Sequence, residues 1–193
     1  KEEYLLGGQL EETNEGYAIA KIAGIKMCEK YNYQYNCNYM TVLPTNLYGP
    51  NDNYDLSNSH VLPALIHKTY LAKQNNDKFI NLWGTGDAKR EFMHVDDLAD
   101  ACLFLAERNH SYEKINIGVG KDITINDLAI KIMNILKYNG SIKYTSIVSD
   151  GSPQKLLDIS ILNKLGWKPK IDLTSGIRSV FKNFKEEFID LSK

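Results

Sequence analysis

A tyrosine and a lysine near the start of the chain, in "NEGYAIAKIAGIK", have types and a spacing that could do chemistry. They are Tyr17 and Lys21, within a segment from about Glu15 to Tyr35 whose apolar and small residues recur at helical spacing. Four helical residues turn through about 400°, which leaves the two side chains only about 40° apart on one face. The sequence therefore predicts a phenol and an ammonium side by side on a helix.

Such a pair can deliver a proton to a carbonyl oxygen. A phenol has a reference pKa of about 10, and a neighbouring ammonium lowers it by favouring the phenolate. The phenol can then protonate a carbonyl oxygen as hydride arrives at its carbon, while the ammonium can also hydrogen-bond a ribose hydroxyl of a cofactor. Two such residues four apart are common by chance, so the flanks matter. The small residues Ala20, Ala23 and Gly24 would let this helix lie close to a sheet or a partner.

The elements that must position this pair alternate between strand and helix, which predicts an α/β fold. Strands are expected at residues 38–43, 78–83, 91–94, 115–118 and 141–147, and helices at 15–35, 59–74, 96–108, 125–138, 159–165 and 175–191. Ser59, Asp96 and Thr124 are the expected N-caps, Thr124 with Asp127 as a capping box. Gly140 is the expected C′ residue of its helix.

Bulk composition excludes several classes of protein. With 193 residues, 43% of them hydrophobic, the chain can build a core as one domain or as most of a two-lobed protein. A net charge of −1 gives no electrostatic case for nucleic acid or a membrane surface, and no apolar run reaches the roughly 20 residues of a membrane span. Cys28, Cys37 and Cys102 are few and lack metal-ligand spacing, so we expect no metal site and reduced thiols in a cytoplasmic protein. The acidic first residues, "KEEYLLGGQLEE", also predict that no signal peptide opens the chain.

A complete dinucleotide-binding domain should begin with an apolar strand that runs into a glycine-rich loop of the G-x-G-x-x-G type. This chain has no such loop, because "GTGDAKREF" holds two glycines but precedes a strand rather than a helix. We therefore expect the sequence to begin about halfway through a protein.

Five ordered blocks carry a resemblance to a known family: "YAIAK", "LPTNLYGP", "NSHVLPALIHK", "WGTGDAKREFMHVDDLA" and "SDGSPQKLLD". Together they resemble the C-terminal part of the extended short-chain dehydrogenase/reductase family, from about Leu5 to the last helix. The resemblance implies that residues 1–59 end an NAD(P)-binding Rossmann-like domain. Residues 60–193 would form mainly a small mixed α/β substrate lobe, with 79–105 returning to the Rossmann sheet. Without the glycine-rich half, this fragment alone is expected to be inactive.

Within the family, the blocks are most similar to members that epimerise a GDP-4-keto-6-deoxy sugar at C3 and C5 and reduce it at C4 with NADPH. The resemblance implies that Tyr17 is the proton donor for reduction and that Lys21 tunes it and holds the nicotinamide ribose. His60 would be the acid of the epimerisation and would also border the cofactor. The family's base is a cysteine in the missing segment, so the base is assigned to no residue here. The expected lining of the nicotinamide pocket is Pro44, Thr45, Asn46 and Leu47.

The nucleotide end of such a substrate needs cations for the pyrophosphate and an aromatic wall for the base. The residues that match the family's basic contacts are Lys68, Arg90 and Lys155. Trp83 matches its aromatic contact, and Asp150 would accept from a sugar or ribose hydroxyl. By contrast, His94, Asp96 and Asp97 in "HVDD" are interpreted as structural helix-start residues, and His67 as a surface residue. The family also implies a homodimer built partly through the tyrosine helix.

Two other functions stay open at this point. Another nucleotide-sugar member, such as a 4-epimerase or a 4,6-dehydratase, would share residues like "YAIAK" but should not place a histidine at position 60. A non-catalytic nucleotide-sugar-binding relative could keep the fold, although the retention of Tyr17, Lys21 and His60 argues against it.

Overall fold

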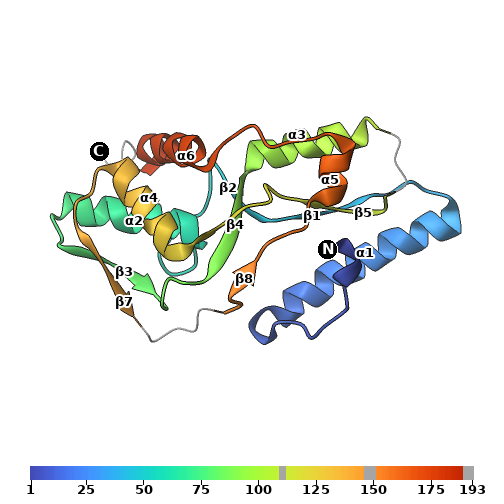
Figure 1. Ribbon diagram of the computed structural model, residues 1–193, viewed down its shortest axis with the longest axis horizontal. Helices are drawn as coiled ribbons and strands as arrows, with labels where there is room; N and C mark the ends of the chain where they lie inside the picture. The colour runs from blue at the N-terminus through green and yellow to red at the C-terminus, as the bar shows by residue number, and fades with distance from the viewer. Residues whose placement is uncertain (109–111, 146–150, 189–193) are drawn as a thin grey trace.

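The structure is a computed structural model that describes residues 1–108, 112–145 and 151–188. It confirms the predicted α/β class, with parallel strand pairs of the Rossmann-like kind (Figure 1). The helices are α1 (Glu15–Tyr35), α2 (Val61–Gln74), α3 (Val95–Ala106), α4 (Ile125–Leu136), α5 (Ser160–Leu165) and α6 (Leu173–Phe188). The strands are β1 (Thr41–Pro44), β2 (Asn46–Tyr48), β3 (Phe79–Trp83), β4 (Lys89–His94), β5 (Lys114–Ile117), β6 (Asp122–Thr124), β7 (Ser141–Thr145) and β8 (Gln154–Lys155). Two short 3₁₀ turns, Glu2–Tyr4 and Glu12–Asn14, precede α1.

Strand β4 is the most connected strand of the described chain. It pairs in parallel with β2, where Asn46 lies opposite Phe92, and in parallel with β8, where Arg90 lies opposite Lys155. Its first half also pairs antiparallel with β6. Two further parallel pairs, β1 with β5 and β3 with β7, lie at the two ends of the molecule (Figure 1).

Two hydrophobic cores lie on either side of this central strand. The first is built on α2, α4 and α6, and its fully buried members include Leu62, Ile66, Leu128, Ile132 and Phe184. The second joins β5, α3 and α5 and includes Ile115, Ile117, Leu105, Leu162 and Trp167. Strand β3 pairs with β7 beside the first core. The division into a Rossmann-like part at 1–59 and a substrate lobe at 60–193 stays a prediction.

The helix starts partly follow the sequence prediction. The Thr124 hydroxyl accepts the N–H of Asp127 at 2.9 Å, which confirms the predicted cap of α4. The cap of α3 is His94 rather than Asp96, because the imidazole Nδ1 accepts the N–H of Asp96 at 3.2 Å. The N-cap of α2 is His60 rather than Ser59.

Helix α4 ends earlier than Gly140, so the predicted stop signal is wrong. Lys137 takes the left-handed conformation at φ 55° in its place. The next residue, Tyr138, is buried and donates its hydroxyl to the carbonyl oxygen of Asp77 at 3.0 Å. This long-range bond draws the chain away from the helix axis before Gly140 is reached.

Helix α1 has the predicted bounds but little cover. It lies on the other side of β1 and β5 from α3 (Figure 1), and of its residues, all of them described, Ile25 alone is buried. An ion pair between Glu29 and Lys114 at 2.9 Å ties the helix to β5. Large apolar side chains are exposed along it, namely Tyr17, Ile19, Met27, Tyr31, Tyr33 and Tyr35. Over residues 1–108, 112–145 and 151–188, no helix has the length and hydropathy needed to cross a bilayer.

Candidate active site

A cleft of about 890 Å³ opens where the start of α1, the β1–β2 segment, the start of α2 and the segment around β8 meet. Ligand pockets in proteins commonly have volumes of about 300–1,000 Å³. The cleft brings together residues that lie up to 140 positions apart, from Tyr17 to Leu157. Seven of the residues singled out from the sequence line it: Tyr17, Pro44, Thr45, Asn46, Leu47, His60 and Lys155.

The tyrosine–lysine pair lies at the start of α1. The Nζ of Lys21 is 5.3 Å from the centroid of the Tyr17 ring, which confirms that the two side chains are neighbours on one helical face. Tyr17 is 62% exposed and borders the cleft. Lys21 is not among the described residues that line it and lies beside Tyr17 at the edge of the site.

His60 enters the cleft from the N-terminus of α2. Its backbone is extended, with φ −68° and ψ 162°, as is usual for an N-cap residue. Within the described chain, however, its side chain makes no capping hydrogen bond. The exposed imidazole therefore faces the cleft without being engaged by the helix end that positions it.

The segment from Pro44 to Leu47 forms one wall and is fixed from two sides. The N–H of Thr45 donates to the carbonyl oxygen of Ile117 in β5 at 3.0 Å. The hydroxyl of Thr45 and the amide nitrogen of Asn46 both donate to the carbonyl oxygen of Glu91 in β4, at 3.1 Å and 2.8 Å. Because both strands hold it, this wall is a preformed surface.

Tyr48 forms part of the cleft lining although its side chain is only 3% exposed. Its ring packs edge-on against His94, with centroids 5.4 Å apart and planes at 87°. Burial raises the pKa of the Tyr48 phenol, and the nearby carboxylates of Asp97 and Asp172 raise it further. The phenol is thus kept neutral as a structural wall.

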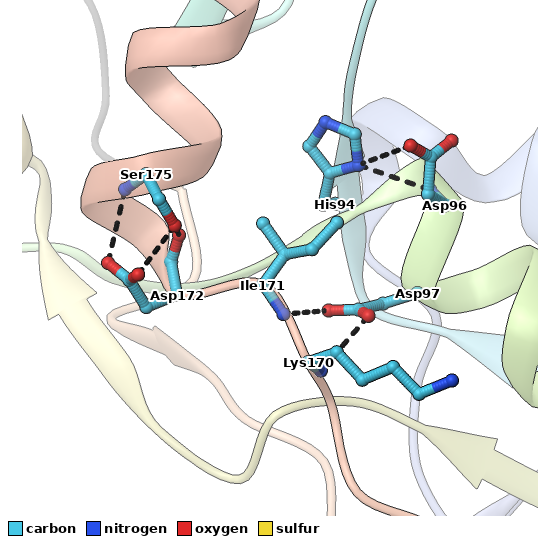
Figure 2. Close-up of polar contacts among 7 residues, drawn as sticks. All are labelled: His94, Asp96, Asp97, Lys170, Ile171, Asp172 and Ser175. Carbon is cyan, nitrogen blue, oxygen red and sulfur yellow. Dashed lines mark hydrogen bonds and ion pairs between the residues drawn. The ribbon is translucent and has the colours of Figure 1, made fainter.

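The "HVDD" residues behind Tyr48 tie α3 to the chain that enters α6 (Figure 2). The buried carboxylate of Asp97 accepts the backbone N–H groups of Lys170 and Ile171, at 3.0 Å each. The carboxylate of Asp172 accepts the N–H of Ser175 at 3.1 Å in the first turn of α6. The helix-start role expected for the motif is confirmed for His94, which caps α3, whereas Asp97 bonds a distant segment instead.

The residues expected at the nucleotide end form two groups. In the first, the Nζ of Lys68 lies 4.4 Å from the Trp83 ring centroid, and burial lowers the pKa of this lysine. Trp83 keeps 55% of its surface exposed. Lys68 is eight residues along α2 from His60, about 12 Å at 1.5 Å per residue. This first group therefore lies outside the lining of the cleft, with Lys68 on the helix that His60 begins and Trp83 at the end of β3.

Arg90 and Lys155 form the second group. They are register partners on the parallel strands β4 and β8, so their side chains share one face of the sheet. Only Lys155 borders the cleft among the described residues. The guanidinium of Arg90 donates to the carbonyl oxygen of Lys89 at 2.7 Å. An anion bound on this face of the sheet could meet both cations. Asp150 lies outside the described residues.

Sequence reasoning missed several features of the cleft. Glu91 holds its walls, and Tyr48 and Leu157 line it. A signal for Glu91 was present, because it directly precedes the apolar residues Phe92 and Met93 in an expected strand, and a glutamate is rarely buried without a partner. The expectation that His67 is a surface residue is wrong, since it is half-buried and its Nδ1 bonds the Tyr54 carbonyl oxygen at 2.7 Å.

Over the residues that the structure describes, no cluster of three or more His, Cys, Asp or Glu side chains could hold a metal ion.

Comparisons with known proteins identify relatives for nearly the whole chain. The profile of the NAD dependent epimerase/dehydratase family matches residues 1–118. The chain is 46% identical over 192 residues to the probable GDP-L-fucose synthase 1 of Oryza sativa subsp. japonica, which covers 100% of this chain and 58% of the relative. It is also 46% identical over 194 residues to the GDP-L-fucose synthase of Escherichia coli (strain K12), covering 96% and 60%.

Solved structures give the same picture. A GDP-L-fucose synthetase from Naegleria fowleri bound to NADP superposes with a TM-score of 0.91 at 27% identity, covering 98% of this chain and 61% of that one. A GDP-6-OMe-4-keto-L-xylo-heptose reductase from C. jejuni superposes with a TM-score of 0.87 at 35% identity, covering 97% and 65%. The chain thus spans 58–65% of the length of these four relatives.

Proposed function

Since the chain belongs to the NAD dependent epimerase/dehydratase family, we propose that it forms the substrate side of a GDP-L-fucose synthase. This enzyme would convert GDP-4-keto-6-deoxy-D-mannose to GDP-L-fucose, by epimerisation at C3 and C5 followed by NADPH-dependent reduction at C4. The observation that carries the proposal is that Tyr17 and His60 border one cleft, because the two reactions need two different acids.

In the reduction, Tyr17 donates its phenolic proton to the C4 carbonyl oxygen. Lys21 beside the ring favours the phenolate that remains and offers an ammonium to a ribose hydroxyl. When bound, NADPH supplies the hydride. The cleft fits the nicotinamide end of this cofactor in volume, and its wall of Pro44–Leu47 is held rigid by β4 and β5.

In the epimerisation, His60 returns a proton to a ring carbon on the face opposite to the one from which it was removed. An imidazole titrates close to neutral pH and can act as this acid. The role is supported by a ring that faces the cleft and is not engaged in capping α2. The base that removes the proton is assigned to no residue of this chain.

At the nucleotide end, Arg90 and Lys155 would bind the pyrophosphate, since they present two cations on one face of the sheet. Trp83, half exposed and backed by Lys68, would stack on part of the nucleotide. Asp150 would accept from a sugar or ribose hydroxyl. For the whole protein we propose a homodimer, because the exposed apolar face of α1 is a surface that a partner could cover.

A second candidate is a GDP-sugar 4-reductase that acts on a different keto sugar. It is favoured by the similarity to the C. jejuni heptose reductase, at 35% identity and a TM-score of 0.87. Such an enzyme would need Tyr17 for the reduction but would not need an acid at His60 for proton exchange at C3 and C5.

The test uses the full-length protein with NADPH and GDP-4-keto-6-deoxy-D-mannose in heavy water, with NMR of the product. Tyr17→Phe should reduce the rate of NADPH oxidation by about 10²–10⁴ and leave GDP binding unchanged. His60→Gln should lose deuterium incorporation at C3, C5 or both, while slow direct reduction at C4 persists. Wild-type NADPH oxidation in Tyr17→Phe would refute the reductase assignment. Normal deuterium incorporation at both carbons in His60→Gln would refute the assignment of His60 as the epimerisation acid. Reduction without deuterium incorporation in the wild-type protein would favour the second candidate.

A further inference from the structure

Glu91 is a completely buried carboxylate that has no role in the chemistry proposed above. It is 0% exposed in β4, and Phe92 and Met93, which follow it on the strand, pack into the two hydrophobic cores. Its Oε1 accepts the backbone N–H groups of Val119 at 2.6 Å and Gly120 at 2.7 Å. Its Oε2 accepts the N–H of Leu157 at 3.2 Å. The three donors belong to two irregular segments far from Glu91 in the sequence.

The backbone of the same residue holds a third segment. The Glu91 carbonyl oxygen accepts both the Thr45 hydroxyl and the Asn46 side-chain amide, at 3.1 Å and 2.8 Å. Thr45 and Asn46 line the cofactor side of the cleft, and Leu157, two residues after Lys155, lines the part formed by the segment around β8. One residue therefore bonds both walls of the cleft.

The fit around the carboxylate is tight. A Cβ added at Gly118 would overlap Oε1 and lie 2.9 Å from Cδ, closer than real Cβ contacts come. A carboxylate buried in this way is costly unless it is fully hydrogen-bonded, and an apolar side chain would hold the strand in the core equally well. An apolar residue, however, could not accept hydrogen bonds from the peptide N–H groups of Val119, Gly120 and Leu157.

We propose that Glu91 is a positioning residue that sets the distance between the cofactor wall and the substrate wall of the cleft. Its carboxylate holds Leu157 and, through it, the neighbouring strand β8. Its carbonyl oxygen holds Thr45 and Asn46, so the two walls are kept at a fixed distance through one residue. The kinetic part of this inference rests on the proposed function, whereas the binding part does not.

Asp97 provides a matched control for a purely structural role. It is also a buried carboxylate, 2% exposed, and it accepts two backbone N–H groups, from Lys170 and Ile171 at 3.0 Å each (Figure 2). None of these three residues is among those that line the cleft in the described chain. Loss of either carboxylate should lower stability, but only loss of Glu91 should change the cleft.

The experiment compares Glu91→Gln with Asp97→Asn in the full-length protein. Each change places an amide NH₂ among peptide N–H donors, so both variants should unfold at lower temperature. In addition, the kcat/KM of Glu91→Gln for NADPH should fall by about 10²-fold, through a lower kcat and a higher KM. This is the loss expected when the walls of a site are displaced by about 1 Å. Asp97→Asn should keep its kinetic constants per folded molecule within a factor of about two.

Wild-type kinetic constants in Glu91→Gln, or an equal loss in Asp97→Asn, would overturn the inference. If the wild-type protein itself shows no turnover, the proposed function fails, and the dissociation constants of NADP and GDP decide about Glu91. A weakening of NADP binding by about tenfold or more, with faster amide exchange at residues 119–120 and 157, would support the inference. Faster exchange with unchanged binding would overturn it. If Glu91→Gln does not fold, Glu91→Asp, which withdraws the carboxylate by about 1.5 Å, is judged by the same criteria.

Discussion

Substitution of Gly176 by alanine tests how closely α6 supports the back wall of the cleft. Gly176 is the fourth residue of α6 and faces the ring of Tyr48. An alanine Cβ at this position would overlap the Tyr48 hydroxyl oxygen and lie 2.9 Å from Cζ and 3.0 Å from Cε2. Ordinary van der Waals contact begins at 3.4 Å, so the ring would have to retreat by about 0.5 Å and its hydroxyl by more.

Two effects of opposite sign compete in this substitution. Alanine is favoured over glycine by about 1 kcal/mol inside a helix. Overpacking a well-filled core costs about 1–3 kcal/mol. Tyr48 is 3% exposed, packed edge-on against His94 and part of the cleft lining, so a displaced ring would disturb the cleft. We therefore expect overpacking to win, with a net loss of stability of up to about 2 kcal/mol and weaker binding of ligands in the cleft.

Urea unfolding of the full-length protein and calorimetric titration with NADP measure the two effects. The control is the double variant Gly176→Ala with Tyr48→Phe, which removes the overlapping oxygen and should recover part of both losses. A Gly176→Ala variant as stable as the wild type, or more stable, would show that helix propensity decides at this position. The reasoning about the close approach of α6 to Tyr48 would then be refuted.

Three further predictions concern charge. Burial lowers the pKa of Lys68 below its usual value of 10.5. GDP binding should therefore weaken as the pH rises through the lowered pKa, because Lys68 then loses its charge. Calorimetric titrations over the same pH range should show a constant affinity for Lys68→Arg, since an arginine keeps its charge. Arg90→Ala should weaken GDP binding by about 1.5–3 kcal/mol and change kcat less, measured by titration and steady-state kinetics. Lys26 and Lys114 lower the pKa of Glu29, so its stabilising contribution is complete above the usual carboxyl value of 4.5 and is lost as the pH falls through the lowered one. The urea midpoint of Glu29→Gln should therefore lie below that of the wild type at pH 7, and the two should converge in acid.

The parts of the site that the sequence predicts depend on local geometry. The adjacency of Tyr17 and Lys21 follows from the helical period alone, and the structure places them on one face. The cap at Thr124 is equally local, because the hydroxyl reaches an N–H three residues along the chain. For such features the interacting groups and the signal lie within a few residues of each other.

The parts that the sequence does not predict depend on contacts between distant segments. The carboxylate of Glu91 meets N–H groups 28, 29 and 66 residues away, and no local pattern encodes such a meeting. The stacking of Lys68 on Trp83 likewise joins α2 to β3 through their packing. The N-cap at His60 was missed because serine is the commoner capping residue and Ser59 stands next to it.

The register of β4 connects these distant contacts, because successive side chains of a strand point to opposite faces. On one face, Arg90 lies beside Lys155 and Phe92 packs into the core of α2, α4 and α6. On the other face, Glu91 receives its three N–H donors and Met93 packs into the core of β5, α3 and α5. A slip of one residue would place the cation of Arg90 against peptide N–H donors and move the carboxylate beside Lys155. Both the proposed anion site and the proposed spacing of the cleft would be lost together, so the register that satisfies the two cores would also set the chemistry of the site.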